Sequence, residues 1–179
     1  MNGCELTTRI EVSMEIDSYR FAAMVAGAGT GNYITTTATS SNAYSIFLGL
    51  QEKIDEKKAP VGGRLAFVTP KFYNFLKLDT AFLRNSDLGQ RMLLNGQVGE
   101  VDGVPVIKVP SSYFPEDVEV IITNPIATVA PIKLQDYKIH DNPPGINGFL
   151  VEGRIRYGAF VLNNKADAIA YNGPAPSTT

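Results

Sequence analysis

The chain has 179 residues, of which 44% are hydrophobic and 19% are charged, and its formal net charge is −2. This length suffices for one core of ordinary size with a small appendage. The 16 basic residues form no block for nucleic acid, the single cysteine excludes an internal disulfide, and no run approaches the roughly 18 apolar residues of a membrane span. The N-terminus lacks the regions of a signal peptide, so we expect a soluble protein with no specific nucleic-acid partner and no membrane partner.

The first third of the chain predicts two helices. Apolar residues recur mostly at steps of three, four or seven over residues 5–27, which indicates a helix that ends at Gly27–Gly31. A loop rich in Gly, Thr and Ser follows over residues 28–41. The second helix is expected over residues 42–57, and three residues can cap its N-terminus: Ser40, Ser41 and Asn42.

The middle of the chain predicts short strands mixed with short helices. Leu65–Val68 is an apolar run typical of a buried strand, and Pro70 can open a helix directly after it. A short helix and a loop are expected over residues 80–95. Residues 97–109 predict a β-hairpin, because Asp102-Gly103 is a favoured two-residue turn between two valine-rich stretches.

The last third of the chain predicts further strands and no more long helices. The strands are expected at Val118–Thr123, Phe149–Leu162 and Ala168–Tyr171. Residues 127–139 are expected to be extended and irregular, and the tail over residues 173–179 is expected to be disordered. Two helices followed by strands and short helices predict an α+β fold, not a doubly wound parallel sheet.

The sequence offers no cluster of residues for catalysis, a cofactor or a metal. A Cys-His nucleophile pair would need Cys4 and His140, which are the single cysteine and histidine and lie far apart in the chain. The glycines of Gly27–Gly31 follow a predicted helix, whereas a phosphate-binding loop follows a strand and opens a helix. We therefore predict that the protein is not an enzyme and has no catalytic, cofactor-binding or metal-binding residues.

Four segments together resemble a known family. They are Gly63–Tyr73, Gly96–Val106, Val118–Thr123 and Gly153–Phe160, and they come in that order within residues 5–170. This order is similar to that of tailed-phage major capsid proteins with the Hong Kong 97 fold. In that family a strand led by arginine and ended by proline precedes a short helix, a glycine-flanked hairpin, a strand and a long returning strand.

The resemblance implies an α+β Hong-Kong-97-type capsid fold, in which an axial domain sheet flanked by helices is joined to part of the peripheral domain. Family members carry an N-terminal arm and an extended hairpin loop ahead of the matching region, so the resemblance implies an N-terminally truncated member or, as the alternative, a shortened relative. The implied division is residues 1–28 for the helical part of the peripheral domain, 29–145 for the axial domain, 146–172 for the return strands of the peripheral domain and 173–179 for the disordered tail.

The resemblance also implies a function. The chain would be a structural subunit of a phage or prophage icosahedral capsid, made in the cytoplasm of the bacterial host and located in the virion capsid. It would act by self-assembly into a shell that encloses DNA. Its partners would be copies of itself in capsomers, and a scaffolding protein is a further candidate partner. The alternatives are an encapsulin-like bacterial compartment shell protein and an unrelated α+β binding domain.

Two arginines and two loops are candidates for contacts between subunits. Arg154 and Arg156 alternate on the predicted long strand and therefore share one of its faces. Two arginines in this arrangement form either a solvated ladder or, as the resemblance suggests, ion pairs across a subunit boundary. The loops over residues 28–41 and 80–95 are the other contact candidates.

Overall fold

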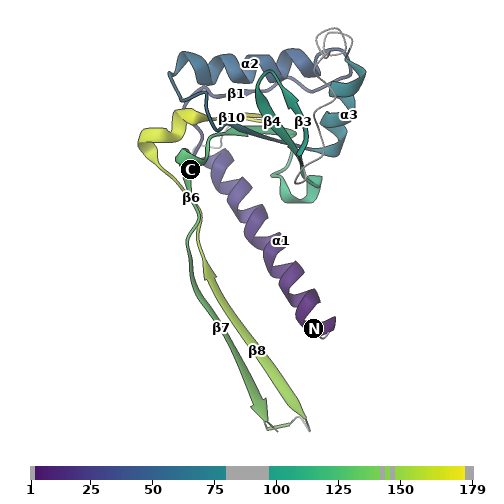
Figure 1. The fold of residues 1–179 in the computed structure, drawn as a ribbon, viewed down its shortest axis with the longest axis vertical. Helices are drawn as coiled ribbons and strands as arrows, with labels where there is room; N and C mark the ends of the chain where they lie inside the picture. Colours follow the sequence, from purple (N-terminus) through teal and green to yellow (C-terminus); the bar gives the residue numbers. More distant parts are fainter. Residues whose placement is uncertain (1–2, 80–96, 142–143, 146–147, 176–179) are drawn as a thin grey trace.

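The chain divides in space into a body and two projections (Figure 1). The body holds a sheet covered by helices, and the projections are the long helix α1 (Gly3–Ala26) and a ribbon of two antiparallel strands, β7 (Ile132–Asp141) and β8 (Phe149–Tyr157). The arrangement is the α+β type that the sequence predicts. The structure is a computed structural model, and the residues it describes are 3–79, 97–141, 144–145 and 148–175.

A six-stranded sheet in the body joins segments from the start, the middle and the end of the chain. Its strand order is β1-β10-β5-β2-β4-β3, in which β1–β10 and β2–β4 are parallel pairs and the other neighbours are antiparallel. The strands are β1 (Tyr33–Ile34), β2 (Leu65–Val68), β3 (Gln97–Val101), β4 (Val104–Lys108), β5 (Val120–Thr123) and β10 (Ile169–Asn172). The last described strand therefore lies inside the sheet, between β1 and β5.

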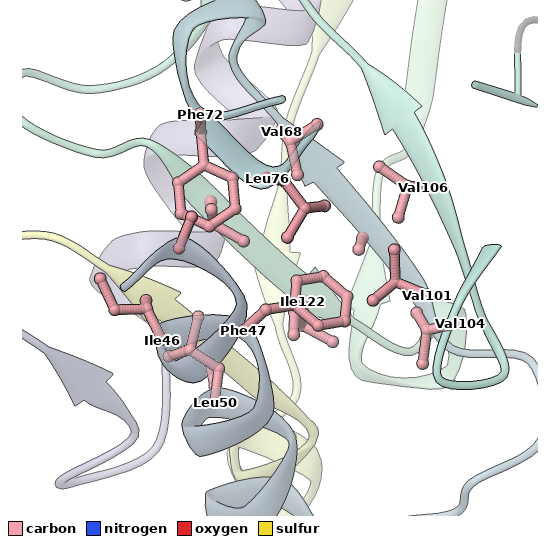
Figure 2. Packing of buried hydrophobic residues seen from close by; sticks show 14 of the residues in the cluster. Ile46, Phe47, Leu50, Val68, Phe72, Leu76, Val101, Val104, Val106 and Ile122 are labelled. Carbon is pink, nitrogen blue, oxygen red and sulfur yellow. The ribbon is translucent and has the colours of Figure 1, made fainter. Parts of the chain in front are cut away.

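Helices α2 (Ala43–Glu56) and α3 (Pro70–Leu78) cover one face of this sheet. Phe47 of α2 and Phe72 of α3 are fully buried against it (Figure 2). Because successive residues of a strand point to opposite faces, each strand gives this core its alternate side chains. They include Ala66, Val68, Val104, Val106, Val120, Ile122 and Ala170.

The opposite face of the sheet packs against the C-terminal end of α1 and several short turns. Phe21 of α1 stacks on Phe114 with ring centroids 5.0 Å apart and meets Phe67 edge-on at 5.1 Å. The strands supply the other set of alternate residues to this second core, among them Ile107, Ile121, Ile169 and Tyr171. Since β5 and β10 are each buried at all four positions, both strands have a core on each face.

Local sequence signals account for several elements. Thr69 caps α3 by accepting a hydrogen bond from the Phe72 N–H, and Pro70 occupies its first turn. Asp102 and Gly103 both have positive φ, 51° and 76°, as the favoured turn of a two-residue hairpin requires. These findings confirm the predicted helix after Leu65–Val68 and the predicted hairpin.

Other expectations are corrected. None of the three candidate residues caps α2 through its side chain: Asn42 occupies the cap position, but its Oδ1 accepts a hydrogen bond from the Thr39 N–H instead. The segment expected to be irregular over residues 127–139 contains most of the regular strand β7. In place of the single strand expected over residues 149–162, the structure has two strands, β8 and β9 (Phe160–Val161). They are separate because the chain turns after β8, so that β9 pairs with β6 (Thr128–Val129).

The C-terminal tail begins later than expected. Gly173 is buried, and its N–H donates to the Ile34 carbonyl at 3.0 Å. Residues 80–95, for which a short helix and a loop are predicted, lie outside the described residues, as do residues 176–179 of the tail.

The strand pairing also crosses the expected boundary at residue 145. Strand β7, from the segment 29–145, pairs with β8 from the segment 146–172 along its length. Strand β10, also from 146–172, pairs with β5 in the six-stranded sheet. The segment 146–172 is therefore divided in space, with β8 in the ribbon and β10 in the six-stranded sheet.

Candidate assembly surface

The base of the ribbon is fastened to helix α1. The Tyr157 hydroxyl at the end of β8 donates a hydrogen bond of 2.8 Å to Glu15 Oε1, and its ring meets the Tyr19 ring edge-on with centroids 5.6 Å apart. The hydrogen bond to Glu15 raises the pKa of Tyr157, because loss of the hydroxyl proton would place a phenolate beside a carboxylate. Helix and ribbon are thus joined by contacts between side chains far apart in sequence.

Close backbone packing joins the same region to the body. A Cβ placed on Gly27, directly after α1, would lie 2.6 Å from the Cβ of Val161 in β9, so only glycine fits there. The Leu162 N–H donates to the Ala127 carbonyl at 2.9 Å, and the Gly158 N–H donates to the Pro131 carbonyl at 3.0 Å. The helix, the ribbon base and the body therefore meet at one tightly packed junction.

One face of the ribbon carries most of its charge. In the antiparallel register Lys138 lies opposite Glu152 and His140 opposite Leu150, and residues directly opposite one another share a face. Alternation places Arg154 and Arg156 on this face as well. His140 Nε2 lies 3.0 Å from Glu152 Oε2, which is a diagonal contact across the two strands. We call this surface the charged face; its described side chains are Lys138, His140, Leu150, Glu152, Arg154 and Arg156.

The other face of the ribbon is largely apolar. Asp141 lies opposite Phe149, and alternation adds Ile139, Ile155 and Tyr157 to the same side. Near the tip, Ile139 is 72% exposed and Phe149 is 75% exposed. We call this surface the apolar face. Exposure of two large apolar side chains on one face is unfavourable in water, so this end of the ribbon is a candidate for contact with another molecule.

A shallow groove lies between α1 and the strands at the base of the ribbon. Its volume is about 20 Å³, which is room for about one water molecule. Arg20, Ala23 and Met24 of α1 form one wall, and the other wall consists of residues 128–130 and 159–161. Arg20 is the charged residue in this lining; its Nη1 pairs with Asp17 Oδ1 at 3.2 Å, whereas its buried Nε has no hydrogen-bond partner among the described residues.

The two arginines predicted as interface residues are both exposed on the charged face. Neither forms an ion pair with another side chain that the structure describes. The loop over residues 28–41 is only partly available for contacts with another molecule. Asn32 and Ala38 are buried, whereas residues 35–37 and 39–41 are exposed. The loop over residues 80–95 lies outside the described residues.

Sequence reasoning missed Ile139 and Phe149 as surface residues. Their apolar character is visible in the sequence, but an apolar residue in a strand is ordinarily read as core. The signal that could have found them is the pairing of two strands of mixed composition around the Pro-Pro-Gly break at residues 143–145. Two strands without a third layer cannot bury both faces.

The described residues contain no group of three or more His, Cys, Asp or Glu side chains that could hold a metal ion. His140 pairs with Glu152 on the exposed charged face. The side chain of Cys4 is not among those that the structure describes. Within the described part of the chain no helix has the length and apolar character needed to cross a membrane.

Comparison by sequence finds no matching protein-family model and no matching curated protein. Comparison by structure does find likeness. The capsid structure of the cyanophage P-SCSP1u superposes with a TM-score of 0.69 at 16% identity, over 99% of this chain and 67% of that chain. A structure from Mycobacterium phage Che8 gives a TM-score of 0.66 at 16% identity, over 94% of this chain and 62% of that chain.

The chain has the α+β fold of phage capsid proteins. A virus-like particle from Pyrococcus furiosus is also similar, with a TM-score of 0.53 and 16% identity over 89% of this chain and 61% of that chain. The capsid fold observed here agrees with the one that the four sequence segments imply. The chain spans about two thirds of the length of these similar proteins.

Proposed function

We propose that the chain is a structural subunit of a phage or prophage capsid, and that it acts by self-association into an icosahedral shell that encloses DNA. The observation that carries the proposal is the likeness to phage capsid structures over 94% and 99% of the chain. In this role the protein is not an enzyme, its partners are copies of itself, and a scaffolding protein is a further partner. It is made in the cytoplasm of the bacterial host and resides in the virion capsid without specific contacts to DNA.

The grouping of segments in space supports a division into two capsid domains. The axial domain corresponds to the body, with its six-stranded sheet and the helices α2 and α3. The peripheral domain corresponds to α1 and the ribbon, which project from the body side by side at their junction (Figure 1). In this division β10 belongs to the axial domain and β7 to the peripheral domain.

Arg154 and Arg156 serve as subunit-interface residues in this proposal. Both are exposed on the charged face, where a carboxylate of a neighbouring subunit can approach them. An ion pair formed at an interface from which water is excluded is stronger than the same pair on a free surface. The alternative role, a solvated ladder within one subunit, predicts no effect of either arginine on assembly.

Electron microscopy of purified protein tests the proposal. Negatively stained particles of the protein are sought over a range of salt and protein concentration, with and without a co-expressed scaffolding protein. Shells or capsomer rings are expected. If the protein remains monomeric by sedimentation under all of these conditions, the capsid function is wrong.

The contents of the particles separate the phage capsid from the encapsulin-like compartment. The phage capsid has the better support, because the structures on which the chain superposes with TM-scores of 0.66 and 0.69 come from phages. A phage capsid is expected to hold DNA after infection or induction of its host. Particles that hold a protein cargo and no DNA would favour the compartment.

A further inference from the structure

We propose that β8 of one copy pairs edge to edge with β8 of a second copy, in antiparallel register about a two-fold axis at Gly153. The two ribbons then form one sheet of four strands. The inference rests on the proposed self-association. It names both a contact through which two subunits meet and the carboxylate that the arginines of the charged face bind.

The outer edge of β8 is open along the ribbon. The ribbon is a sheet of its own, so β8 has one hydrogen-bonded neighbour, β7, among the described strands. A strand turns its N–H and C=O groups to both of its sides, and those on the outer side of β8 have no strand partner within the described chain. A two-stranded hairpin is marginally stable in water, so further strands would stabilise it.

Helix α1 does not cover this edge. It meets β8 at the base of the ribbon through Tyr157, whose side chain lies on the apolar face. Since side chains stand roughly perpendicular to a sheet, a helix reached in this way lies over the face of the ribbon and not beside its edge. Beyond the base the helix and the ribbon diverge (Figure 1). A second strand can therefore approach β8 from the side.

β8 also lacks features that keep an edge strand from pairing. Protected edges are commonly short, bulged or interrupted by proline. β8 has nine residues and no proline, and the register shift of the ribbon falls in β7, between Ile132 and Leu134. Gly153 lies at the centre of β8 without a bulge, and a glycine inside a regular strand often marks the close approach of another backbone. Of the two edges of the ribbon, β8 is therefore the one suited to pairing.

The sequence of β8 is complementary to itself about Gly153. In an antiparallel pair centred there, residues at equal distances on the two sides of Gly153 lie opposite one another. Glu152 then faces Arg154 of the second copy on the charged face, and Phe149 faces Tyr157 of the second copy on the apolar face. Opposite charges and aromatic rings are both favourable cross-strand pairs. Each pair forms twice, because the two copies are related by the two-fold axis.

Neighbouring registers are less favourable. A pair centred on residue 152 places Glu152 opposite the same residue of the second copy, and a pair centred on residue 154 does so with Arg154, so like charges meet in both. A relative shift of one residue places the apolar face of one ribbon beside the charged face of the other. The register about Gly153 avoids both faults.

This register gives partners to the charged groups of the ribbon. Arg154 and Arg156 form no ion pair with another described side chain, and Glu152 keeps 62% of its side chain exposed while it contacts His140. In the paired ribbons Arg154 of the second copy lies directly opposite Glu152. Arg156 of the second copy lies diagonally from it, within reach of a long side chain. The carboxylate of Glu152 is therefore the group that the two arginines share.

The apolar end of the ribbon gains cover from the same pairing. Phe149, which is 75% exposed in the single chain, comes beside Tyr157 at the ribbon base of the second copy. The ring of Tyr157 already meets that of Tyr19, which is itself 48% exposed. Contacts between aromatic rings are favourable beyond the area that they bury.

Antiparallel pairing keeps the two bodies apart. Each ribbon projects from its body (Figure 1), and the tip of one ribbon lies at the base of the other when the two strands run in opposite directions. Nine residues span roughly 30 Å, so the bodies stand at opposite ends of the sheet. The contact is isologous, because both copies use the same surface, and it fits a two-fold axis of an icosahedral shell.

Cross-linking between two separately prepared variants tests the register. Both carry Cys4→Ser; one also carries Leu150→Cys and the other Arg156→Cys, at exposed positions that face each other across the axis. The two positions 150 lie roughly 20 Å apart along the strands, which a short bismaleimide cannot span. A cross-linked dimer is therefore expected from the mixture and not from either variant alone. Lys138→Cys, exposed on β7, replaces Arg156→Cys in the control mixture and is expected to give no dimer.

Two results would overturn the pairing. One is the absence of the dimer from the mixture. The other is an equally abundant dimer from the Leu150→Cys variant alone, which would mean that the ribbons meet in another register or in parallel.

Charge exchange gives an independent measurement in sedimentation equilibrium. Glu152→Arg and Arg154→Glu are each expected to weaken association roughly tenfold, because like charges then face each other twice across the axis. The variant with both substitutions restores opposite charges and is expected to recover most of the loss. The exposed Lys165→Glu is the control and is expected to leave association unchanged. Failure of the double variant to recover association would show that the two residues do not face each other.

Amide hydrogen exchange identifies the edge that is covered. Exchange along β8 is expected to slow as the protein concentration rises, whereas exchange along β7 is expected to stay unchanged. The opposite result would assign the contact to β7. Slow exchange along β8 in a protein that sediments as a monomer would mean that another strand, and not a second copy, occupies the edge.

These results distinguish a wrong contact from a wrong function. If shells form equally well from the wild type and from Glu152→Arg, the pairing is wrong and the capsid function stands. If the specific cross-link forms but the protein makes no shells under any condition of the microscopy, the pairing stands and the capsid function is wrong.

Discussion

The hydroxyl of Tyr157, at the base of the ribbon, donates a hydrogen bond of 2.8 Å to the carboxylate of Glu15 in the middle of helix α1. The bond links residues 142 positions apart and sets the place at which the ribbon leaves the helix. The Tyr157→Phe variant removes the bond but keeps the ring contact with Tyr19. We expect faster amide hydrogen exchange along β8 and only a small fall in Tm, since an exposed hydrogen bond contributes little to the stability of the whole fold.

The same bond predicts a dependence on alkaline pH. The pKa of the Tyr157 hydroxyl is raised in the folded protein, so the stabilisation is complete below the ordinary tyrosine value of 10.0 and is lost as the pH rises through the folded pKa. Ribbon exchange in the wild type should therefore approach that of Tyr157→Phe above about pH 10. Equal pH dependence in the two proteins would show that the hydroxyl does not hold the ribbon.

The core under α2 is expected to be sensitive to truncation at Phe47. This side chain is fully buried between α2 and the sheet. Phe47→Ala should reduce the free energy of unfolding by about 3–5 kcal/mol, because it removes apolar contact and leaves a cavity. Urea denaturation followed by circular dichroism measures the change. Ser45→Ala, at an exposed position of the same helix, is the control and should change the free energy by less than about 0.5 kcal/mol.

The hairpin turn is expected to tolerate Asn but not Val at position 103. Gly103 has a φ of 76°, and a Cβ there would meet no other atom within 4 Å, so any cost of substitution is conformational and not steric. Gly103→Val should lower the free energy of unfolding by about 1–2 kcal/mol, and Gly103→Asn by clearly less, because asparagine adopts positive φ readily. Equal stability of all three proteins would contradict the role assigned to the turn.

Charge reversal on the charged face of the ribbon is expected to impair assembly and not folding. Arg154→Glu and Arg156→Glu should leave the monomer Tm within about 2 °C of the wild type, because both side chains are exposed. Particle yield in sedimentation should fall at least severalfold. The exposed Lys165→Glu is the matched control. Equal loss of stability and assembly would mean that the arginines serve the subunit's own fold.

Elements with local causes could be predicted from the sequence, and elements with distant partners could not. The Asp102-Gly103 turn specifies its hairpin by its own backbone preferences, and the Pro70 helix has its cap in the preceding residue. By contrast, β7 has a mixed sequence because neither of its faces is covered by the body, so no burial pattern reveals it. Its strand character depends on pairing with β8.

The buried polar residues show the same limit. Arg64 looks like a surface residue in the sequence, but its side chain is only 2% exposed and pairs with Asp55 at 2.7 Å. Its Nη2 and Nε also donate to the carbonyls of Ala59 and Pro60. Asn124 fastens the same loop through the Gly62 carbonyl. These pairings link α2, β2 and β5, and their partners are known only once the sheet is assembled.

The candidate site was partly predictable for the same reason. Alternation alone places Arg154 and Arg156 on one face, and the structure keeps that relation. The exposed pair near the tip, Ile139 and Phe149, depends on the register between two strands on either side of a proline-rich break. The groove depends on three segments that meet only in the folded chain.

The ribbon leaves and re-enters the body at a single pair of residues. Thr123 ends β5, Ile169 begins β10, and the two are directly opposite in the sheet. The intervening excursion can therefore change in length without disturbing any strand of the body. Adding two residues to each strand would move the tip outward by roughly 7 Å and keep the charged and apolar faces on their sides, whereas adding one to each would exchange them. The length of the ribbon thus sets how far its tip stands from the body, and with the two faces kept in place it can change only in steps of two residue pairs.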